Sequence, residues 1–289
     1  MPRLRIRHES LYAYSTPVEF GVWRLLMRPL DSHAIRVLDA SLETPPGQLT
    51  WTFDAYGNSV CYLQPLGAAD HLRVVNNLLI ERFPTPLGVV GWSTPTLPVL
   101  YGVAARRALE SFIAPDTPDL DAAYADWLRL SGPRADEPAL AFLQRMTTNI
   151  HDTFAYVARD APGVQGPAET IAHRSGTCRD FAWLMIESVR HLGFAARFAT
   201  GYLHAPGAAM RGACATHAWC EVFLPEAGWM EFDPTNALVE SYSLIRVASA
   251  RTWQEASPMV GSVFGQATSQ LHVSVDVELM DEAFPARAA

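Results

Sequence analysis

The sequence predicts an α+β protein, in which strands and helices occupy separate stretches of the chain. Two observations predict this class. Residues 1–82 contain short runs of alternating apolar and polar residues between turn signals, which is typical of antiparallel strands. Further along, a helical run that begins at Cys178 is followed by several strand-like runs. A packed core is expected because 49% of the residues are hydrophobic and only 18% are charged.

The first 85 residues are expected to form an N-terminal β-sandwich. Leu4, Ile6 and His8 alternate with arginines, and this rhythm continues to Pro17, which is expected to break it. Further strand-like runs lie at residues 36–42, 49–53, 59–64 and 71–80. Turn signals such as Pro45-Pro46-Gly47 and Asp54-x-x-Gly57-Asn58 separate them, and short strands at this spacing indicate a sandwich.

Residues 86–135 are expected to form a proline-rich linker with short helices. The longest uncharged stretch, residues 83–105, holds four prolines, which favours a loop over a membrane-spanning helix. Apolar residues at helical spacing then predict short helices at 104–112 and 120–130.

Residues 136–289 are expected to form the second domain, which begins with a helix at 138–150. Its central helix is expected to begin at Cys178 and to stop at Gly193. The apolar face of that helix is formed by Phe181, Leu184, Met185, Ser188, Val189 and Leu192. Strands are expected at 195–203, 217–224 and 229–233, and an alternating run at 271–279 is expected to close this domain.

The charged residues exclude several classes of function. The 22 basic residues are all arginines, against 30 acidic residues, so the net charge is −8. This balance excludes a basic nucleic-acid surface and a polybasic membrane-binding arm. Without lysine there is no Schiff base, no P-loop lysine and no lysine general base. An arginine-favouring coding bias is the simplest explanation of the missing lysine.

The start of the chain and its cysteines point to the cytoplasm. Charges and apolar residues are interleaved in the first 14 residues, and no apolar segment typical of a signal peptide follows. The four cysteines form no CxxC pair and no regular ladder. Reduced thiols in a cytoplasmic protein are therefore expected.

Cys178 is the first residue with the setting of a nucleophile. Thr177-x-x-Asp180 fits a capping box, which makes Thr177 the N-cap and Cys178 the first helical residue. The helix dipole and the unpaired N–H groups there favour a thiolate and could hold a developing oxyanion. A buried structural cysteine is the alternative when Cys178 is considered alone.

A second pair of candidates lies on the predicted hairpin. His217 and Trp219 share one strand face, and a loop of about four residues places Asp233 opposite Trp219, diagonal to His217. Asp233 could then fix the tautomer of His217, and His217 could take the proton of Cys178. The alternatives are a non-catalytic histidine and, for Asp233-Pro234, a simple turn.

These candidates lie within segments that match a known family. The segments are, in order, Ser175-Gly176-Thr177-Cys178-Arg179-Asp180-Phe181, Arg197, Gly201-Tyr202, His217-Ala218-Trp219, Gly228-Trp229 and Asp233-Pro234-Thr235. They resemble the transglutaminase-like core. The resemblance implies a papain-like core in which a helix bearing the cysteine packs on an antiparallel sheet. It also implies that Cys178 is the nucleophile, His217 the base and Asp233 the orienting acid.

The N-terminal region carries a second resemblance. Its matching segments are His8-x-x-x-Tyr12-x-Tyr14-x-x-Pro17-Val18, Arg24-Leu25, Arg28-Pro29 and Asp54-x-x-Gly57-Asn58. They are similar to the β-rich region that precedes the core in bacterial members of the family. Together the two resemblances cover most of the chain.

The second oxyanion donor is left open among three residues. Tyr156 matches an aromatic residue often found upstream of the nucleophile in this family, and His151 and Gln165 are the alternatives. For Tyr156, simple packing is an equal alternative. Tyr156 and Trp219 are assigned to the oxyanion and substrate pocket.

A zinc site is the competing interpretation of the same segment. Cys214-x-x-His217-x-x-Cys220 places three ligand types at every third position. On a strand, however, the two cysteines point away from His217, so the three would not converge. The sequence also contains no EF-hand calcium loop. No metal and no cofactor are therefore expected.

The predicted activity is acyl transfer through a thioester on Cys178. Its substrate is an amide or peptide carbonyl of a protein or peptide, and the thioester passes to water or to an amine acceptor. Hydrolysis is slightly favoured. The alternative is a non-enzymatic interaction module on the same fold. The presence of all three triad residues argues against this alternative. No nucleic-acid or membrane partner is expected, and the sequence carries no indication of oligomeric state.

Overall fold

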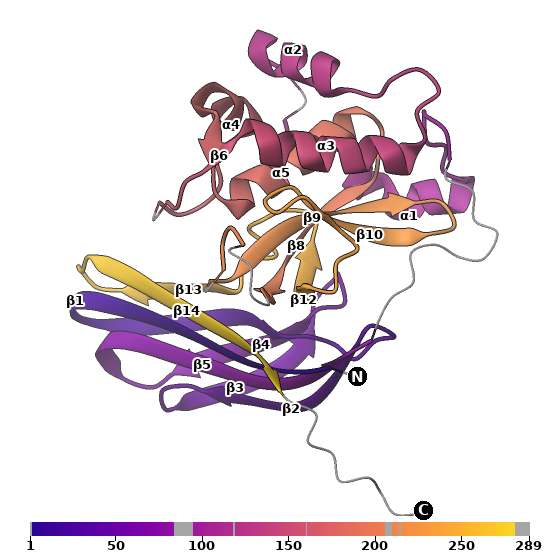
Figure 1. Cartoon of the computed structure of the whole chain (residues 1–289). Coiled ribbons are helices and arrows are strands. Elements are labelled where there is room, and N and C mark those ends of the chain that lie inside the picture. The colour runs from indigo at the N-terminus through magenta and orange to yellow at the C-terminus, as the bar shows by residue number, and fades with distance from the viewer. Residues whose placement is uncertain are drawn as a thin grey trace, which may run out of the picture.

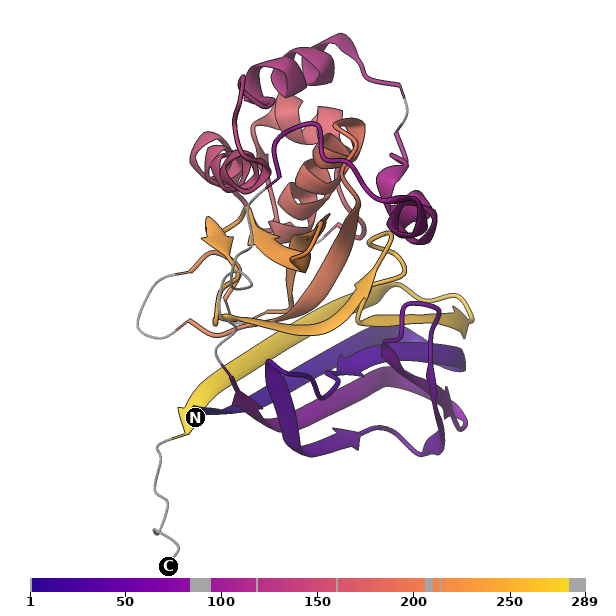
Figure 2. The same ribbon diagram turned by 90° about the vertical axis from the view of Figure 1, so that its right-hand side faces the viewer.

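The computed structural model describes residues 2–83, 95–117, 119–159, 161–205, 210–213 and 215–280. The protein has three layers (Figure 1). A strand-rich sheet lies at one end, a five-stranded sheet lies in the middle, and helices cover the far face of the middle sheet. Figure 2 shows the same stacking from the side. The expected α+β class is therefore confirmed. Within the described residues no helix is both long enough and apolar enough to cross a bilayer.

The strand-rich layer is one antiparallel sheet that is folded back on itself. Its strands are β1 (Arg3–Arg28), β2 (Ile35–Glu43), β3 (Gly47–Phe53), β4 (Ser59–Pro65), β5 (Ala68–Arg82), β13 (Met259–Phe264) and β14 (Ser269–Met280). Contrary to expectation, β1 does not end at Pro17. The pairing register with β5 shifts between Ala13 and Val18, so the strand bends there and continues. A register shift tolerates proline because the missing N–H is not needed in the ladder.

The two halves of this folded sheet face each other across a small core. Leu72 of β5 packs in one cluster with Leu63 and Cys61 of β4 and with Trp23 of β1. The N-terminal sheet thus encloses an apolar core between its two halves, as a β-sandwich does. The long strand β1, however, runs through both halves. This continuity is why the region forms a single curled sheet.

The last strand occupies a different place from the one expected. The run at 271–279 does form a strand, β14, but it pairs with β1 from Tyr14 opposite Ser269 to Arg3 opposite Met280. β14 therefore completes the N-terminal sheet and does not close the second domain. The physical reason is the free edge of β1, whose backbone groups need partners. The domain limits proposed from the sequence stay a prediction.

The middle sheet holds the strands predicted around His217. Its order is β11 (Leu238–Val239), β10 (Gly228–Asp233), β9 (His217–Leu224), β8 (Ala196–Leu203) and β12 (Leu244–Ala250). In the β9–β10 hairpin, Glu231 lies opposite Glu221 and Phe232 opposite Cys220. This register carries Asp233 toward Trp219, as the hairpin spacing predicts. The edge strand β12 and the short strand β11 were not anticipated.

The helices pack on one face of the middle sheet. They are α1 (Val103–Ile113), α2 (Ala122–Ser131), α3 (Ala139–Thr153), α4 (Pro167–His173) and α5 (Cys178–His191), with a two-stranded sheet of β6 (Ala155–Tyr156) and β7 (Ser175–Gly176) beside α5. Helix α4 was not anticipated. Helix α5 was expected to bury one face, but every residue from Asp180 to Arg190 is buried. It lies between the sheet and the other helices.

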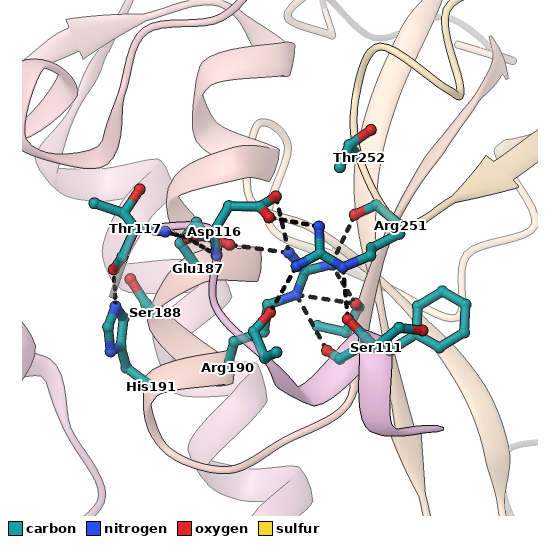
Figure 3. Close-up of polar contacts among 12 residues, drawn as sticks. Ser111, Asp116, Thr117, Glu187, Ser188, Arg190, His191, Arg251 and Thr252 are labelled. Carbon is teal, nitrogen blue, oxygen red and sulfur yellow. Dashed lines mark hydrogen bonds and ion pairs between the residues drawn. The ribbon is translucent and has the colours of Figure 1, made fainter. Parts of the chain in front are cut away.

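Full burial of α5 requires partners for its charged side chains (Figure 3). The Arg190 guanidinium donates to Glu187 Oε1 at 2.9 Å. The other oxygen of Glu187 accepts the backbone N–H groups of Asp116 and Thr117, both at 2.9 Å. Arg190 also donates to the carbonyl oxygen of Arg251, just after β12, at 2.7 Å. These bonds fasten α5 to the α1–α2 connection and to the sheet, so the position of Cys178 is fixed as well.

A buried polar cluster joins the two sheets. The amide of Asn76 on β5 donates to the hydroxyl of Tyr202 on β8 at 3.1 Å, and this hydroxyl also contacts Nδ1 of His8 on β1 at 3.2 Å. Burial lowers the pKa of His8 to about 4, so its ring is neutral at physiological pH. Apolar residues, among them Leu4 and Ile245, surround the cluster. The second sheet therefore depends on the N-terminal one for a satisfied core.

Replacing Tyr202 by phenylalanine should destabilise the protein. The change removes one hydroxyl and leaves the buried groups of Asn76 and His8 without that partner, so the expected loss is about 1–3 kcal/mol. Urea unfolding followed by fluorescence measures it as a lower midpoint. Tyr62→Phe, on the exposed face of β4, is the matched control and should change stability by less than about 0.5 kcal/mol. Equal midpoints for the two variants would contradict the structural role of the cluster.

Candidate functional site

The N-terminus of α5 is held by its own capping residues. Asp180 Oδ2 accepts the backbone N–H of Thr177 at 2.8 Å and its hydroxyl at 2.9 Å, which completes the predicted capping box. Asp180 Oδ1 binds Arg159 and the backbone N–H of Gln165, each at 2.7 Å. Cys178 follows as the first helical residue and is only 6% exposed. As at the start of any α-helix, its backbone N–H has no acceptor within the helix.

His217 and Asp233 form a buried hydrogen-bonded pair at one end of the middle sheet. His217 is the first residue of β9, Asp233 is the last residue of β10, and neither side chain is exposed. The His217 Nε2 lies 2.9 Å from Asp233 Oδ2. The second ring nitrogen, Nδ1, is buried and has no hydrogen-bond partner within the described residues. The ring is thus anchored through Nε2, and Nδ1 is left for a second partner.

Charge, and not burial, determines the ionisation of this pair. Burial disfavours the imidazolium, but the Asp233 carboxylate and the nearby Cys178 thiol outweigh it and raise the pKa of His217 from 6.5 to about 10. Burial likewise opposes ionisation of Asp233, yet His217 and the hydrogen bonds keep the pKa of this carboxyl below its usual range. An imidazolium–carboxylate pair beside the thiol is therefore the form present near neutral pH.

Two family models match the chain. One, described as the transglutaminase-like superfamily, matches residues 130–234 and includes all three residues of this site. The other, described as the bacterial transglutaminase-like N-terminal region, matches residues 4–81. The chain belongs to the transglutaminase-like superfamily. The resemblance read from the sequence is confirmed.

Individual proteins are also similar to this chain. An uncharacterized protein of Mycobacterium tuberculosis (strain ATCC 25618 / H37Rv) is 27% identical over 95% of this chain and 92% of its own length. A protein-glutamine gamma-glutamyltransferase of Pseudomonas aeruginosa is 33% identical, but over only 39% of this chain and 18% of that protein. A crystal structure from Cytophaga hutchinsonii, provisionally described as a cysteine protease, has a TM-score of 0.73 at 21% identity and covers 98% of this chain and 92% of its own. This last similarity shows a shared transglutaminase-like fold.

Tyr156 lies near His217, on the side of the ring that carries Nδ1. A Cβ atom at Gly212 would come within 3.3 Å of the Tyr156 hydroxyl and 3.2 Å of His217 Nδ1, so both groups adjoin the same backbone. Burial raises the pKa of Tyr156 to about 12, and the charge of Cys178 adds to the effect. The hydroxyl therefore keeps its proton at neutral pH and is able to donate a hydrogen bond.

The other residues considered for the pocket have different surroundings. Trp219 is fully buried and stacks on His217 at 6.1 Å between ring centroids. His151 Nδ1 donates to the carbonyl oxygen of Thr235 at 2.8 Å, so this ring is occupied elsewhere. The Gln165 amide donates to Ser175, while its oxygen is buried without a partner in the described part of the chain.

The zinc interpretation finds no further support. Cys214 lies outside the described residues, and Cys220 packs in the apolar cluster around α5. His217 instead bonds to Asp233. Among the side chains that the structure describes, no three histidines, cysteines or carboxylates gather as a metal site would require.

Sequence reasoning missed Asn236. Its amide donates to Asp233 Oδ2 at 3.0 Å, the oxygen that also binds His217. Asn236 directly follows the matched segment that ends at Thr235, so adjacency was the one available signal. Its contacts with Arg211 join residues 25 positions apart, which no local pattern predicts.

Replacing Asp233 by asparagine should lower the pKa of His217 well below about 10, because the ring stays buried but loses the carboxylate that stabilises its charge. The folded-state pKa lies above the ordinary value, so the pair stabilises the folded protein fully below about pH 6.5 and progressively less up to about pH 10. Ring titration by NMR measures the shift. The buried His8 ring is the internal control and should not move. An unchanged titration of His217 in the variant would contradict this electrostatic account.

Proposed function

We propose that this transglutaminase-like protein is a cysteine enzyme that attacks an amide or peptide carbonyl and forms a thioester on Cys178. The observation that carries the proposal is the His217–Asp233 bond. It uses Nε2 and leaves Nδ1, which is buried and has no other hydrogen-bond partner in the described part of the chain, for the neighbouring Cys178 thiol. The order nucleophile, base and orienting carboxylate is that of a catalytic triad.

Acylation begins with the Cys178–His217 pair. The Nδ1 proton of the His217 imidazolium comes from the Cys178 thiol, and the resulting thiolate sulfur attacks the carbonyl carbon. The carbonyl oxygen becomes an oxyanion, to which the N–H of Cys178 and the Tyr156 hydroxyl are the proposed donors. As the intermediate collapses, the C–N bond breaks and His217 gives its proton to the leaving amine. The acyl group then remains on Cys178 as a thioester.

Deacylation repeats these steps with a new nucleophile. His217 takes a proton from the acceptor, which attacks the thioester carbonyl, and the Cys178 sulfur leaves as a thiolate beside the imidazolium. Water gives a carboxylic acid, and an amine gives a new amide. We place hydrolysis first because water needs no binding site of its own, whereas transfer needs a bound amine. The similarity to a P. aeruginosa protein-glutamine gamma-glutamyltransferase supports transfer to an amine as the second candidate reaction. We also propose the cytoplasm as the location, because reducing conditions keep the thiol available.

Cys178 should be alkylated faster than the other cysteines by iodoacetamide at pH 6, by at least about tenfold. The reason is the imidazolium beside it, whereas burial raises the pKa of Cys61 to about 11 and moves that of Cys220 further upward. Mass spectrometry of tryptic peptides measures all four cysteines. His217→Ala should remove the advantage, and Cys178→Ala should reduce turnover by about a thousandfold or more. A Cys178 no faster than the rest would favour the interaction module over the enzyme.

The protein should not cross-link itself through glutamine–lysine bonds at any concentration. No lysine is present to supply the acceptor amine, so only an α-amino group could serve. Denaturing electrophoresis and mass spectrometry after long incubation measure this outcome. A glutamine peptide with and without an added primary amine is the control for activity, and it also separates hydrolysis from transfer. Oligomers with such isopeptide bonds would refute the prediction.

A further inference from the structure

Asn236 connects the orienting carboxylate to a second segment of the chain. Its Nδ2 donates to Asp233 Oδ2 at 3.0 Å and to the carbonyl oxygen of Arg211 at 3.2 Å. Its Oδ1 accepts the backbone N–H of Arg211 at 2.8 Å. All three bonds require one orientation of the amide, because both partners of Nδ2 only accept and the partner of Oδ1 only donates. Aspartate could not make this set, since it has no donor when ionised.

Arg211 is fastened a second time by its side chain. The guanidinium donates to the carbonyl oxygen of His151 on α3 at 2.9 Å. The ring of His151 in turn donates to the carbonyl oxygen of Thr235 at 2.8 Å. A closed set of hydrogen bonds thus runs from Asn236 to Arg211, to His151 and back to the segment that bears Asp233. Neither Arg211 nor Asn236 is fully buried, so water can take the place of these hydrogen-bond partners when the bonds break.

The segment held in this way lies against the His217 ring, on the side that carries Nδ1. Arg211 is followed by Gly212, whose φ of +77° favours glycine. A Cβ atom there would lie 3.2 Å from His217 Nδ1, so the Gly212 backbone already lies close to the nitrogen that faces the thiol. On the preceding side, Met210 packs against Trp219 and its neighbours. The described turn, Met210–Ala213, therefore lies against His217 and Trp219, on the side of the ring that carries Nδ1.

We propose that Asn236 is a positioning residue that clamps the turn Met210–Ala213 over the His217 ring, and that the turn must lift to admit a bulky acyl donor. This inference rests on the proposed function of the same site. The clamp and the triad share Asp233 Oδ2, so release of the turn also frees one bond to the orienting carboxylate. Asn236 acts through Gly212 and Asp233 and touches no reacting atom.

The test compares Asn236→Ala with the wild type and with Asn77→Ala, whose amide bonds to exposed Glu43 on the distant sheet. Hydrogen exchange reports the Arg211 amide, which should exchange about tenfold faster in Asn236→Ala because its acceptor is lost. Alkylation by iodoacetamide and by the bulkier N-phenylmaleimide gives a rate ratio for Cys178. The rate with N-phenylmaleimide relative to the rate with iodoacetamide should rise in Asn236→Ala and stay unchanged in Asn77→Ala. Asn236→Asp keeps the acceptor for Arg211, so it should protect the amide better than alanine does.

Two results would overturn the clamp: unchanged exchange at Arg211, or a rate ratio equal to that of Asn77→Ala. These measurements need no turnover, so they are separate from the test of the enzyme. If the wild type shows no amidase or transferase activity but the exchange and the rate ratio both change as expected, the proposed function fails and the clamp stands. If the wild type is active and neither changes in Asn236→Ala, the clamp fails and the proposed function stands.

Discussion

The burial of α5 from Asp180 to Arg190 is the constraint on which the rest of the structure depends. The charged side chains in this buried stretch must find partners inside the protein, since an unpaired buried charge is costly. Asp180 meets this demand at one end through Thr177, Arg159 and Gln165. Glu187 and Arg190 meet it at the other end through each other and the backbone of neighbouring segments. The N-terminal N–H groups beside Cys178 are the polar groups that the helix leaves available.

The same balance of burial and charge governs the His217–Asp233 pair. Burial alone would neutralise both groups, and His8 shows this outcome: without a carboxylate, burial lowers the pKa of its ring to about 4. For His217 the carboxylate reverses the effect and raises the pKa to about 10. These two buried histidines thus differ in charge because their hydrogen-bond partners differ. Of the two, only His217, beside the thiol, is an imidazolium at neutral pH.

The N-terminal sheet supports the second sheet from behind. The face of β8 and β12 that turns away from α5 packs on residues from both ends of the chain, including Ile6 of β1 and Val275 of β14. The polar cluster around Tyr202 lies in this contact. Because the strand that bears Tyr202 also pairs with the strand that begins at His217, the position of the base depends on this support.

Local chemistry in the sequence determined the capping of α5 and the β9–β10 hairpin, and the resemblance to the transglutaminase-like core singled out Cys178, His217 and Asp233. The cap and the hairpin depend on spacing within a few residues, where dihedral preferences and side-chain parity are decisive. The folded sheet, the pairing of β14 with β1, the burial of α5 on all sides and the contact of Asn236 with Arg211 were decided only by the tertiary structure. Each of these depends on backbone or side-chain groups that are distant in sequence and that pair because burial leaves them no water.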